Sequence, residues 1–263
     1  MLSKEILKNA VAEVRAESPL VHNITNFVVM NNTANALLAI GASPVMAHAL
    51  DEVADMTKIA SSLVLNIGTL ENAWVESMLV AGKTAAAFQK PVVFDPVGAG
   101  ATPFRLSVCS RILSEVGPSI IRGNASEIMA LAKAGTRTKG VDSTASSDEA
   151  LSLATALAKE TRSTVVVSGA VDVVTDGERL ERIPYGHPLM GRVTGMGCTA
   201  TAILGAFAAV IPDMFLAASC GMAVMGIAGE IAGKTARGTG SMQVEFLDAL
   251  TRLSDADIDA VFC

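Results

Sequence analysis

The sequence predicts a doubly wound α/β fold, one domain over residues 1–263, with helices on both faces of a mostly parallel sheet. Three observations indicate this class. Short apolar runs recur without polar alternation, which is typical of strands buried on both faces of a parallel sheet. Segments with helical periodicity separate these runs. No linker rich in glycine, proline or serine divides the chain, and its length suits one large domain.

The elements are expected in a regular order along the chain. A helix over residues 4–16 comes first, an extended segment begins at Pro19, and a helical stretch over 27–40 ends at Gly41. The expected strands are residues 43–46, 62–67, 91–94, 119–122 and 163–168. The helices between them are residues 51–60, 72–88, 104–116, 125–134 and 148–160. Residues 171–175 and 181–183 predict an antiparallel hairpin, and helices dominate after it.

Composition predicts how the core is packed. Hydrophobic residues make up 51% of the chain and aromatic residues only 4%, so small aliphatic side chains and 22 glycines must bring backbones close together. Charged residues make up 17%, below the typical value of about 25%. This low charge favours an oligomer that hides part of the surface, although a sparsely charged monomer is an alternative.

Several classes of protein are excluded or disfavoured. A net charge of −6 without a cluster of basic residues argues against a nucleic-acid partner. The four cysteines and three histidines have no zinc-site spacing, and the charged, amphipathic N-terminus is no signal peptide, so we expect a cytoplasmic protein. Residues 193–212 and 214–229 carry no charge, but we interpret them as two buried helices rather than as membrane spans.

The residues before the first uncharged helix resemble an anion-binding loop. Gly195 and Gly197 allow backbone N–H groups to turn inward, and a helix is expected directly behind them, over 199–210. Cys198 falls in the first turn, where the helix dipole favours a thiolate. The alternative is an ordinary turn into a helix with a buried, inert cysteine.

Polar residues at the carboxyl ends of the expected strands form a second group of candidates, because ligands bind at this edge of a parallel sheet. Asp95 and Glu127 are hard oxygen ligands that suit Mg²⁺. Asn124 and Ser126 have the competing interpretation of helix caps. Arg122 ends an apolar strand, which favours a phosphate partner, whereas a salt bridge with Asp95 or Glu127 is the alternative.

Six strings together resemble the hydroxyethylthiazole kinase family of thiamine salvage, which belongs to the ribokinase-like superfamily. They occur in the family's order and span roughly residues 19–242. The strings are residues 22–26 (HNITN), 41–46 (GASPVM), 65–69 (LNIGT), 95–102 (DPVGAGAT), 121–127 (IRGNASE) and 193–198 (VTGMGC).

The resemblance implies a three-layer ribokinase-like sandwich that phosphorylates the primary alcohol of 4-methyl-5-(2-hydroxyethyl)thiazole with ATP and Mg²⁺. It implies that Asn26, Met46 and Gly195 bind the thiazole substrate. The residues it implies for the ATP phosphates are Arg122, Ser168, Thr194 and Gly197. Asp95 and Glu127 would organise Mg²⁺, and Cys198 would be the catalytic residue. It also implies a homotrimer with sites at the subunit interfaces.

Position 198 separates this chain from related kinases, most of which carry an aspartate there as the base. The resemblance leaves two roles open for Cys198, a modest base or a group that positions the alcohol, because little nucleophile activation is needed in a loose phosphoryl-transfer transition state. A hydroxymethylpyrimidine or sugar kinase, and a non-catalytic protein that binds a thiazole or a nucleotide, are the alternative functions.

Overall fold

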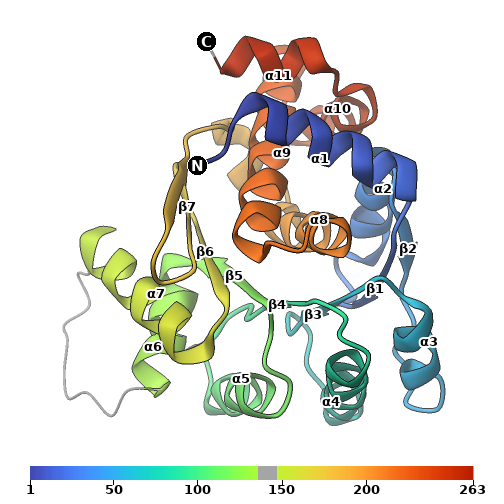
Figure 1. Ribbon diagram of the computed structural model, residues 1–263, viewed down its shortest axis with the longest axis vertical. Helices are drawn as coiled ribbons and strands as arrows, with labels where there is room; N and C mark the ends of the chain where they lie inside the picture. The colour runs from blue at the N-terminus through green and yellow to red at the C-terminus, as the bar shows by residue number, and fades with distance from the viewer. Residues whose placement is uncertain (136–146, 263) are drawn as a thin grey trace.

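The computed structural model describes residues 1–135 and 147–262 and has three layers (Figure 1). A central eight-stranded sheet has the order β2-β1-β3-β4-β5-β6-β7-β8. Strands β1 to β6 run parallel, whereas β7 and β8 are antiparallel to their neighbours. The predicted mostly parallel sheet and its terminal hairpin are therefore confirmed. The strands are β1 (Leu20–Ile24), β2 (Ser43–Val45), β3 (Ser62–Asn66), β4 (Val92–Asp95), β5 (Ile120–Asn124), β6 (Thr164–Ser168), β7 (Asp172–Thr175) and β8 (Leu180–Ile183).

Helices cover both faces of this sheet, as predicted (Figure 1). On one face lie α1 (Lys4–Glu17), α2 (Met30–Ile40), α8 (Met196–Val210), α9 (Met214–Thr235), α10 (Thr239–Arg252) and α11 (Asp255–Val261). On the other face lie α3 (Val53–Ile59), α4 (Asn72–Ala87), α5 (Pro103–Glu115), α6 (Ala125–Gly135) and α7 (Ser147–Thr161). A short 3₁₀ helix, η1 (Pro188–Arg192), precedes α8.

Each face of the sheet has its own apolar core. Val64 and Val93 pack against the first layer of helices, whereas Leu63 and Leu65 pack against the second. Successive residues of one strand thus point into opposite cores. This double burial is the physical reason why the strand sequences show no alternation of polar and apolar residues.

The two uncharged stretches form α8 and α9, as the sequence predicts. By length and composition α9 could cross a membrane, but 78% of its most apolar 18-residue window is buried inside the fold. The absence of a Cβ at Gly205 brings α8 onto the sheet, since a methyl group there would lie 2.6 Å from Val64 Cγ2. Close backbone approach therefore supplies the packing that the few aromatic residues cannot.

Two expected helix starts differ from the structure. The helix expected from residue 27 begins at Met30, because the side chain of Asn26 accepts the amide of Val28 and holds a turn there. The helix expected from residue 199 begins at Met196, directly after Gly195. Both differences lie next to the candidate site.

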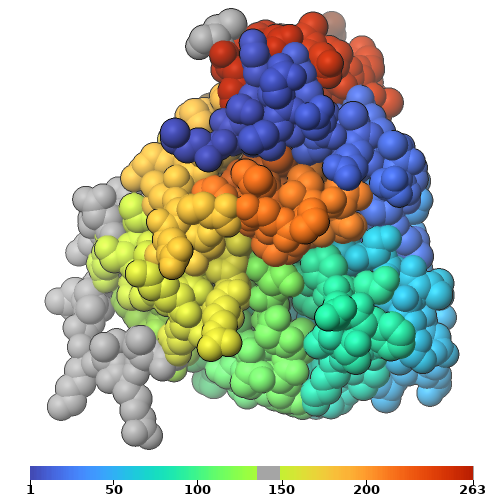
Figure 2. All heavy atoms as spheres, in the orientation of Figure 1, coloured from blue at the N-terminus to red at the C-terminus, as the bar shows by residue number. Residues whose placement is uncertain are grey.

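The two ends of the chain pack together on the upper layer (Figure 2). In α1, the ammonium of Lys8 donates to the Asp259 carboxylate of α11 at 2.9 Å. The prediction that residues 1–263 form one domain stays a prediction, because residues 136–146 and 263 lie outside the described residues.

Candidate active site

The polar residues that end neighbouring parallel strands meet at one edge of the sheet. Asn66 of β3 lies in register with Asp95 of β4, and Asn124 of β5 lies in register with Ser168 of β6. All of these strands run in the same direction, so their carboxyl ends coincide. The structure thereby brings together candidates that are up to about a hundred residues apart in the sequence.

Arg122 and Ser168 form the centre of the site. The Arg122 Nε–H donates to Ser168 Oγ at 2.8 Å, and the guanidinium lies against the start of α8. A Cβ on Gly197 would be only 2.6 Å from Arg122 Nη1, so the glycine is what admits the cation. The sequence alternative, a salt bridge with Asp95 or Glu127, is wrong: among the described residues, no carboxylate lies within 4.0 Å of this guanidinium. The Arg122 charge is therefore available to an anion.

The loop before α8 has the geometry expected of an anion-binding site. Gly195 has a φ of +84° and is the residue that precedes the first helical turn. Its Cβ would lie 2.7 Å from Val29 Cγ1, so a side chain would not fit there. Gly197 and Cys198 thus lie in the first turn, where backbone N–H groups have no partner within the helix. These amides and the positive end of the helix favour a negatively charged ligand beside Arg122.

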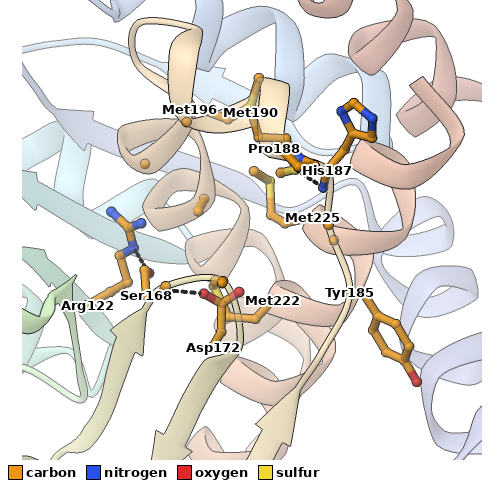
Figure 3. A pocket seen from close by; sticks show the side chains of 17 residues that line it. Arg122, Ser168, Asp172, Tyr185, His187, Pro188, Met190, Met196, Met222 and Met225 are labelled. Atoms are coloured by element: carbon orange, nitrogen blue, oxygen red, sulfur yellow. Dashed lines mark hydrogen bonds between the residues drawn. The ribbon is translucent and has the colours of Figure 1, made fainter. Parts of the chain in front are cut away.

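A cavity of about 530 Å³ opens beside this pair (Figure 3). Arg122, Ser168 and Gly197 line one end of it. The rest of its lining is mainly apolar and includes Pro188, Met190, Met196, Met222 and Met225. Its volume and its mixture of apolar walls and a few polar groups are typical of small-molecule sites. Thr194, predicted to bind phosphate, is exposed and does not line this cavity.

Asp95 is completely buried beneath the start of α8. Its Oδ2 accepts hydrogen bonds from Asn66 Nδ2 and from Thr201 Oγ1, both at 2.8 Å. Its Oδ1 has no partner among the described residues. Burial raises the pKa of Asp95 to about 6, and the positive charge of Arg122 partly opposes that shift. A buried carboxylate oxygen without a partner is the kind of atom that a cation or a donor from a ligand satisfies.

Glu127 is held by backbone amides at the start of α6. Its Oε1 accepts from the Gly98 N–H and its Oε2 from the Asn124 N–H, both at 2.8 Å. Asn124 Oδ1 in turn accepts from the N–H of Glu127 at 2.9 Å and from Ser126 Oγ at 2.6 Å. The capping interpretation of Asn124 is therefore confirmed. The described residues contain no cluster of three or more His, Cys, Asp or Glu side chains that could by itself hold a metal ion.

These two carboxylates still fit Mg²⁺ of the kind that accompanies nucleotides. Such an ion keeps several waters and takes only one or two protein carboxylates together with phosphate oxygens. The unpartnered Oδ1 of Asp95 supplies one hard oxygen, and the oxygens of Glu127 keep lone pairs beyond the amides they accept. The donor set suits a shared site and not a closed protein cage.

Cys198 lies in the first turn of α8, half-buried. Its Sγ accepts a hydrogen bond from Asn26 Nδ2 at 3.4 Å, and the same Nδ2 donates to Asn66 Oδ1 at 2.8 Å. Burial raises the pKa of the Cys198 thiol, and the nearby charge of Asp95 adds to the effect. Burial and Asp95 therefore oppose the thiolate that the helix dipole favours, and the role of this cysteine stays a prediction.

Two of the three residues expected to bind the thiazole, Asn26 and Gly195, lie at the start of α8. Asn26 contacts Cys198 directly, and Gly195 packs on Val29, three residues after Asn26. Met46 follows β2, one strand further out, and is half-buried. The structure thus brings Asn26 and Cys198 into contact near Gly195, whereas Met46 follows the neighbouring edge strand.

Sequence reasoning missed two partners of the site and one cavity residue. Asn66 was visible only as part of a polar string, and Thr201 lies one turn into α8, where nothing in the sequence distinguishes it from a core position. Asp172 lines the cavity from the start of β7, and its placement after a strand end was the one available signal.

The architecture is shared with known proteins. A ribokinase-like superfamily protein from Enterococcus faecalis matches with a TM-score of 0.67 at 13% identity, covering 95% of this chain and 93% of that chain. At this identity the likeness shows the fold alone. This likeness defines the class of the protein, which has the ribokinase-like fold.

Closer relatives then define the family. The profile of the hydroxyethylthiazole kinase family matches residues 11–256. A hydroxyethylthiazole kinase from Leptospira biflexa is 54% identical over 256 residues, 96% of each chain. The solved structure of a hydroxyethylthiazole kinase protein from Pyrococcus horikoshii matches with a TM-score of 0.90 at 46% identity, covering 97% of this chain and 96% of that chain. This chain belongs to the hydroxyethylthiazole kinase family, whose members are phosphotransferases.

Proposed function

We propose that this protein transfers the γ-phosphoryl group of ATP to the primary alcohol of 4-methyl-5-(2-hydroxyethyl)thiazole. One observation supports the phosphoryl-transfer part: the Arg122 cation, which forms no salt bridge among the described residues, lies against the amino end of α8, beside Ser168 and the cavity. Family membership supports the choice of alcohol.

Each site residue has a role in this proposal. Arg122 and Ser168 hold phosphate oxygens, with the amide of Gly197, because a guanidinium, a hydroxyl and a helix N-terminus all donate to phosphate. Thr194 belongs to the same loop, although its side chain is exposed. Asn26, Met46 and Gly195 bind the thiazole on the opposite side of Cys198 from the phosphates.

The alcohol oxygen attacks the γ-phosphorus in line, the bond to the β-phosphate oxygen breaks, and the alcohol proton leaves for solvent or a phosphate oxygen. The first-turn amides and Arg122 stabilise the charge on the transferring group, which carries most of the catalysis in a loose transition state. Cys198 keeps its proton near neutral pH and positions the alcohol; Asn26 fixes its sulfur.

Asp95 and Glu127 would hold Mg²⁺ through the unpartnered Oδ1 and through water. When bound there, the ion neutralises negative charge on the phosphates. Asn66 and Thr201 orient Asp95 toward that task, since both donate to its other oxygen.

The working form in this proposal is a cytoplasmic homotrimer with sites at the subunit interfaces. Its support is an apolar surface beside the thiazole site: Phe27 and Val28, directly after Asn26, are 61% and 65% exposed. Neighbouring apolar side chains that remain in water on an isolated chain favour a protein partner, here a second copy.

An ATP-consumption assay tests the function, with hydroxyethylthiazole, hydroxymethylpyrimidine and ribose as acceptors side by side. We expect turnover of the thiazole alone, detected as ADP release and as the thiazole phosphate by mass spectrometry. Turnover of the pyrimidine or of ribose would instead identify another kinase, and binding of ATP without turnover of any acceptor would indicate a binding protein. Arg122→Ala with unchanged kcat and ATP KM would contradict the phosphate site.

A further inference from the structure

The buried carboxylate of Asp172 has no part in the reaction described above. Asp172 begins β7, and its Oδ1 accepts the backbone N–H of Gly169 at 2.9 Å, which closes the turn between β6 and β7. One oxygen is enough for that structural bond. The other has no protein donor among the described residues, although the side chain is only 9% exposed.

The carboxylate points into the cavity, between Ser168 and Met222 (Figure 3). The other polar side chains beyond Ser168 have contacts of their own. The Tyr185 ring packs on Phe262 at 5.9 Å, and its side chain points away from Asp172 (Figure 3), whereas His187 Nδ1 accepts the Leu189 N–H. Among the described residues that line this cavity, Asp172 is the one that offers a carboxylate to a ligand.

The cavity changes character along its length. At one end, Arg122 and Ser168 supply a cation and a hydroxyl. Around the rest of the cavity, Pro188, Met190, Met222 and Met225 supply apolar walls. Asp172 lies beside Ser168, with Met222 next to it (Figure 3). A nucleoside triphosphate has the same order of groups: anionic phosphates, a sugar with hydroxyl donors, and a flat base that an apolar wall accommodates.

A carboxylate can only accept hydrogen bonds, so its ligand must supply donors. A phosphate group supplies none and would be repelled, which separates Asp172 from the phosphate end. Burial raises the pKa of Asp172 to about 6, while the hydrogen bond from Gly169 and the charge of Arg122 act to lower it. The carboxyl group is therefore mostly ionised at neutral pH. A buried anion with one open oxygen gains most from hydroxyl donors that replace its lost water.

We propose that Asp172 is a specificity-determining residue whose carboxylate accepts hydrogen bonds from the ribose hydroxyls of the bound nucleotide, so that the protein selects ribonucleotides over deoxyribonucleotides. The inference rests on the proposed use of ATP. Carboxylates take the same role toward ribose in other nucleotide-binding α/β folds. The methionine side chains that line the cavity have no strong hydrogen-bonding group that would distinguish one base from another.

The test compares ATP, 2′-deoxyATP and 3′-deoxyATP as phosphoryl donors to hydroxyethylthiazole, in the wild type and in Asp172→Asn. Asparagine keeps an oxygen for the Gly169 N–H but replaces the open acceptor with a donor. For the wild type we expect kcat/KM to fall roughly 10- to 100-fold with at least one deoxynucleotide, as for loss of a hydrogen bond to a charged group. In Asp172→Asn we expect the preference to shrink to less than about 3-fold, through a lower kcat/KM for ATP.

A matched control is Asp176→Asn, the same chemical change at the far end of β7 and outside this cavity. It should keep the wild-type preference. Equal use of the three nucleotides by the wild type, or a full preference in Asp172→Asn, would overturn the inference. If no acceptor is phosphorylated, the proposed function fails. Calorimetric binding of ATP and the deoxynucleotides to both variants then still tests Asp172 on its own.

Discussion

At the scale of residues, the site is a continuous set of hydrogen bonds. Cys198 accepts from Asn26, which also donates to Asn66, and Asn66 donates to Asp95. The proposed alcohol site and the proposed cation site therefore share one set of buried hydrogen bonds. Removal of any member leaves a buried polar atom unpaired, which is costly.

Cys198→Ser tests whether the thiol acts as a base. Burial raises the thiol pKa, so a positioning role predicts that kcat of the serine variant stays within about 10-fold of the wild type and that both have the same pH profile from about pH 6.5 to about pH 8.5. A thiolate base would instead give a rise in kcat with pH that the serine variant lacks. Steady-state rates with saturating ATP decide between the two.

Gly197→Ala tests the placement of Arg122. The new methyl group would lie 2.6 Å from Nη1 and 3.2 Å from Nη2, so the guanidinium must move away from Ser168 and from the amides of α8. We expect a roughly 10-fold higher KM for ATP, little change in the thiazole KM, and a normal melting temperature, because only the flexible end of a side chain shifts.

The control is Gly240→Ala, where a Cβ meets no atom within 4 Å. Its kinetics should match the wild type. An unchanged ATP KM in Gly197→Ala would remove Arg122 from the phosphate site.

At the scale of elements, the start of α8 fixes the site, and the β7–β8 hairpin is tied to the start of α9. The Asp213 carboxylate caps α9 by accepting the Phe215 N–H at 3.0 Å and receives two hydrogen bonds from Arg179, at 2.6 and 2.9 Å. The guanidinium also stacks 4.4 Å above the Phe215 ring. This tie holds the hairpin, and with it Asp172, against the upper layer.

Asp213→Asn should lower stability in a pH-dependent way. The Arg179 hydrogen bond lowers the pKa of Asp213 in the folded protein, so its contribution is present above the ordinary aspartate pKa and is lost as pH falls through the lowered value. Because the pair is partly exposed, we expect a loss of about 1 kcal/mol at pH 7, or about 2–4 °C in melting temperature. The gap to the wild type should begin to narrow below about pH 4 and close once the pH is below the lowered pKa of Asp213.

Thermal melts by circular dichroism measure this effect. Asp55→Asn is the control, because Asp55 forms an exposed i,i+3 pair with Lys58 and caps no helix. It should shift the melting temperature by less than about 1 °C. A gap for Asp213→Asn that does not change between pH 7 and pH 3 would contradict the electrostatic origin.

At the scale of the whole molecule, the proposed trimer explains the low charge. We expect the wild type to sediment as three copies of the 27.0 kDa chain and Val28→Asp to sediment as smaller species with reduced kcat, since a charge in an apolar interface is costly. The control is Phe88→Asp, which places the same charge at another exposed apolar residue, at the end of α4. This variant should keep the sedimentation mass and the activity of the wild type. A monomeric wild type with full activity would refute the trimer.

Much of this site was predictable because local sequence encodes it. The apolar runs predicted the parallel sheet, and parallel strands share a carboxyl edge. Asp95 and Ser168 each end a strand, whereas Arg122 lies in the middle of β5, which runs two residues further than expected. The glycines of residues 195 and 197 indicated a helix start with free amides. These inferences need only strand direction and backbone freedom.

The rest depended on tertiary contacts between distant residues. Asn26 and Cys198 are 172 residues apart and Thr201 and Asp95 are 106 apart, so no local pattern pairs them. The order of β1 to β6 and the seating of α8 on Gly205 bring them together.

The sequence by itself thus determined the fold class, the edge of the sheet that carries the chemistry, and the residue types there. Only the tertiary structure decided that Arg122 forms no salt bridge among the described residues, that Cys198 is half-buried near Asp95, and that Asp172 lines the cavity. The physical reason is that charge state and pairing follow from burial and from the groups within a few ångströms, and these are set by how helices pack on the sheet and not by neighbours along the chain.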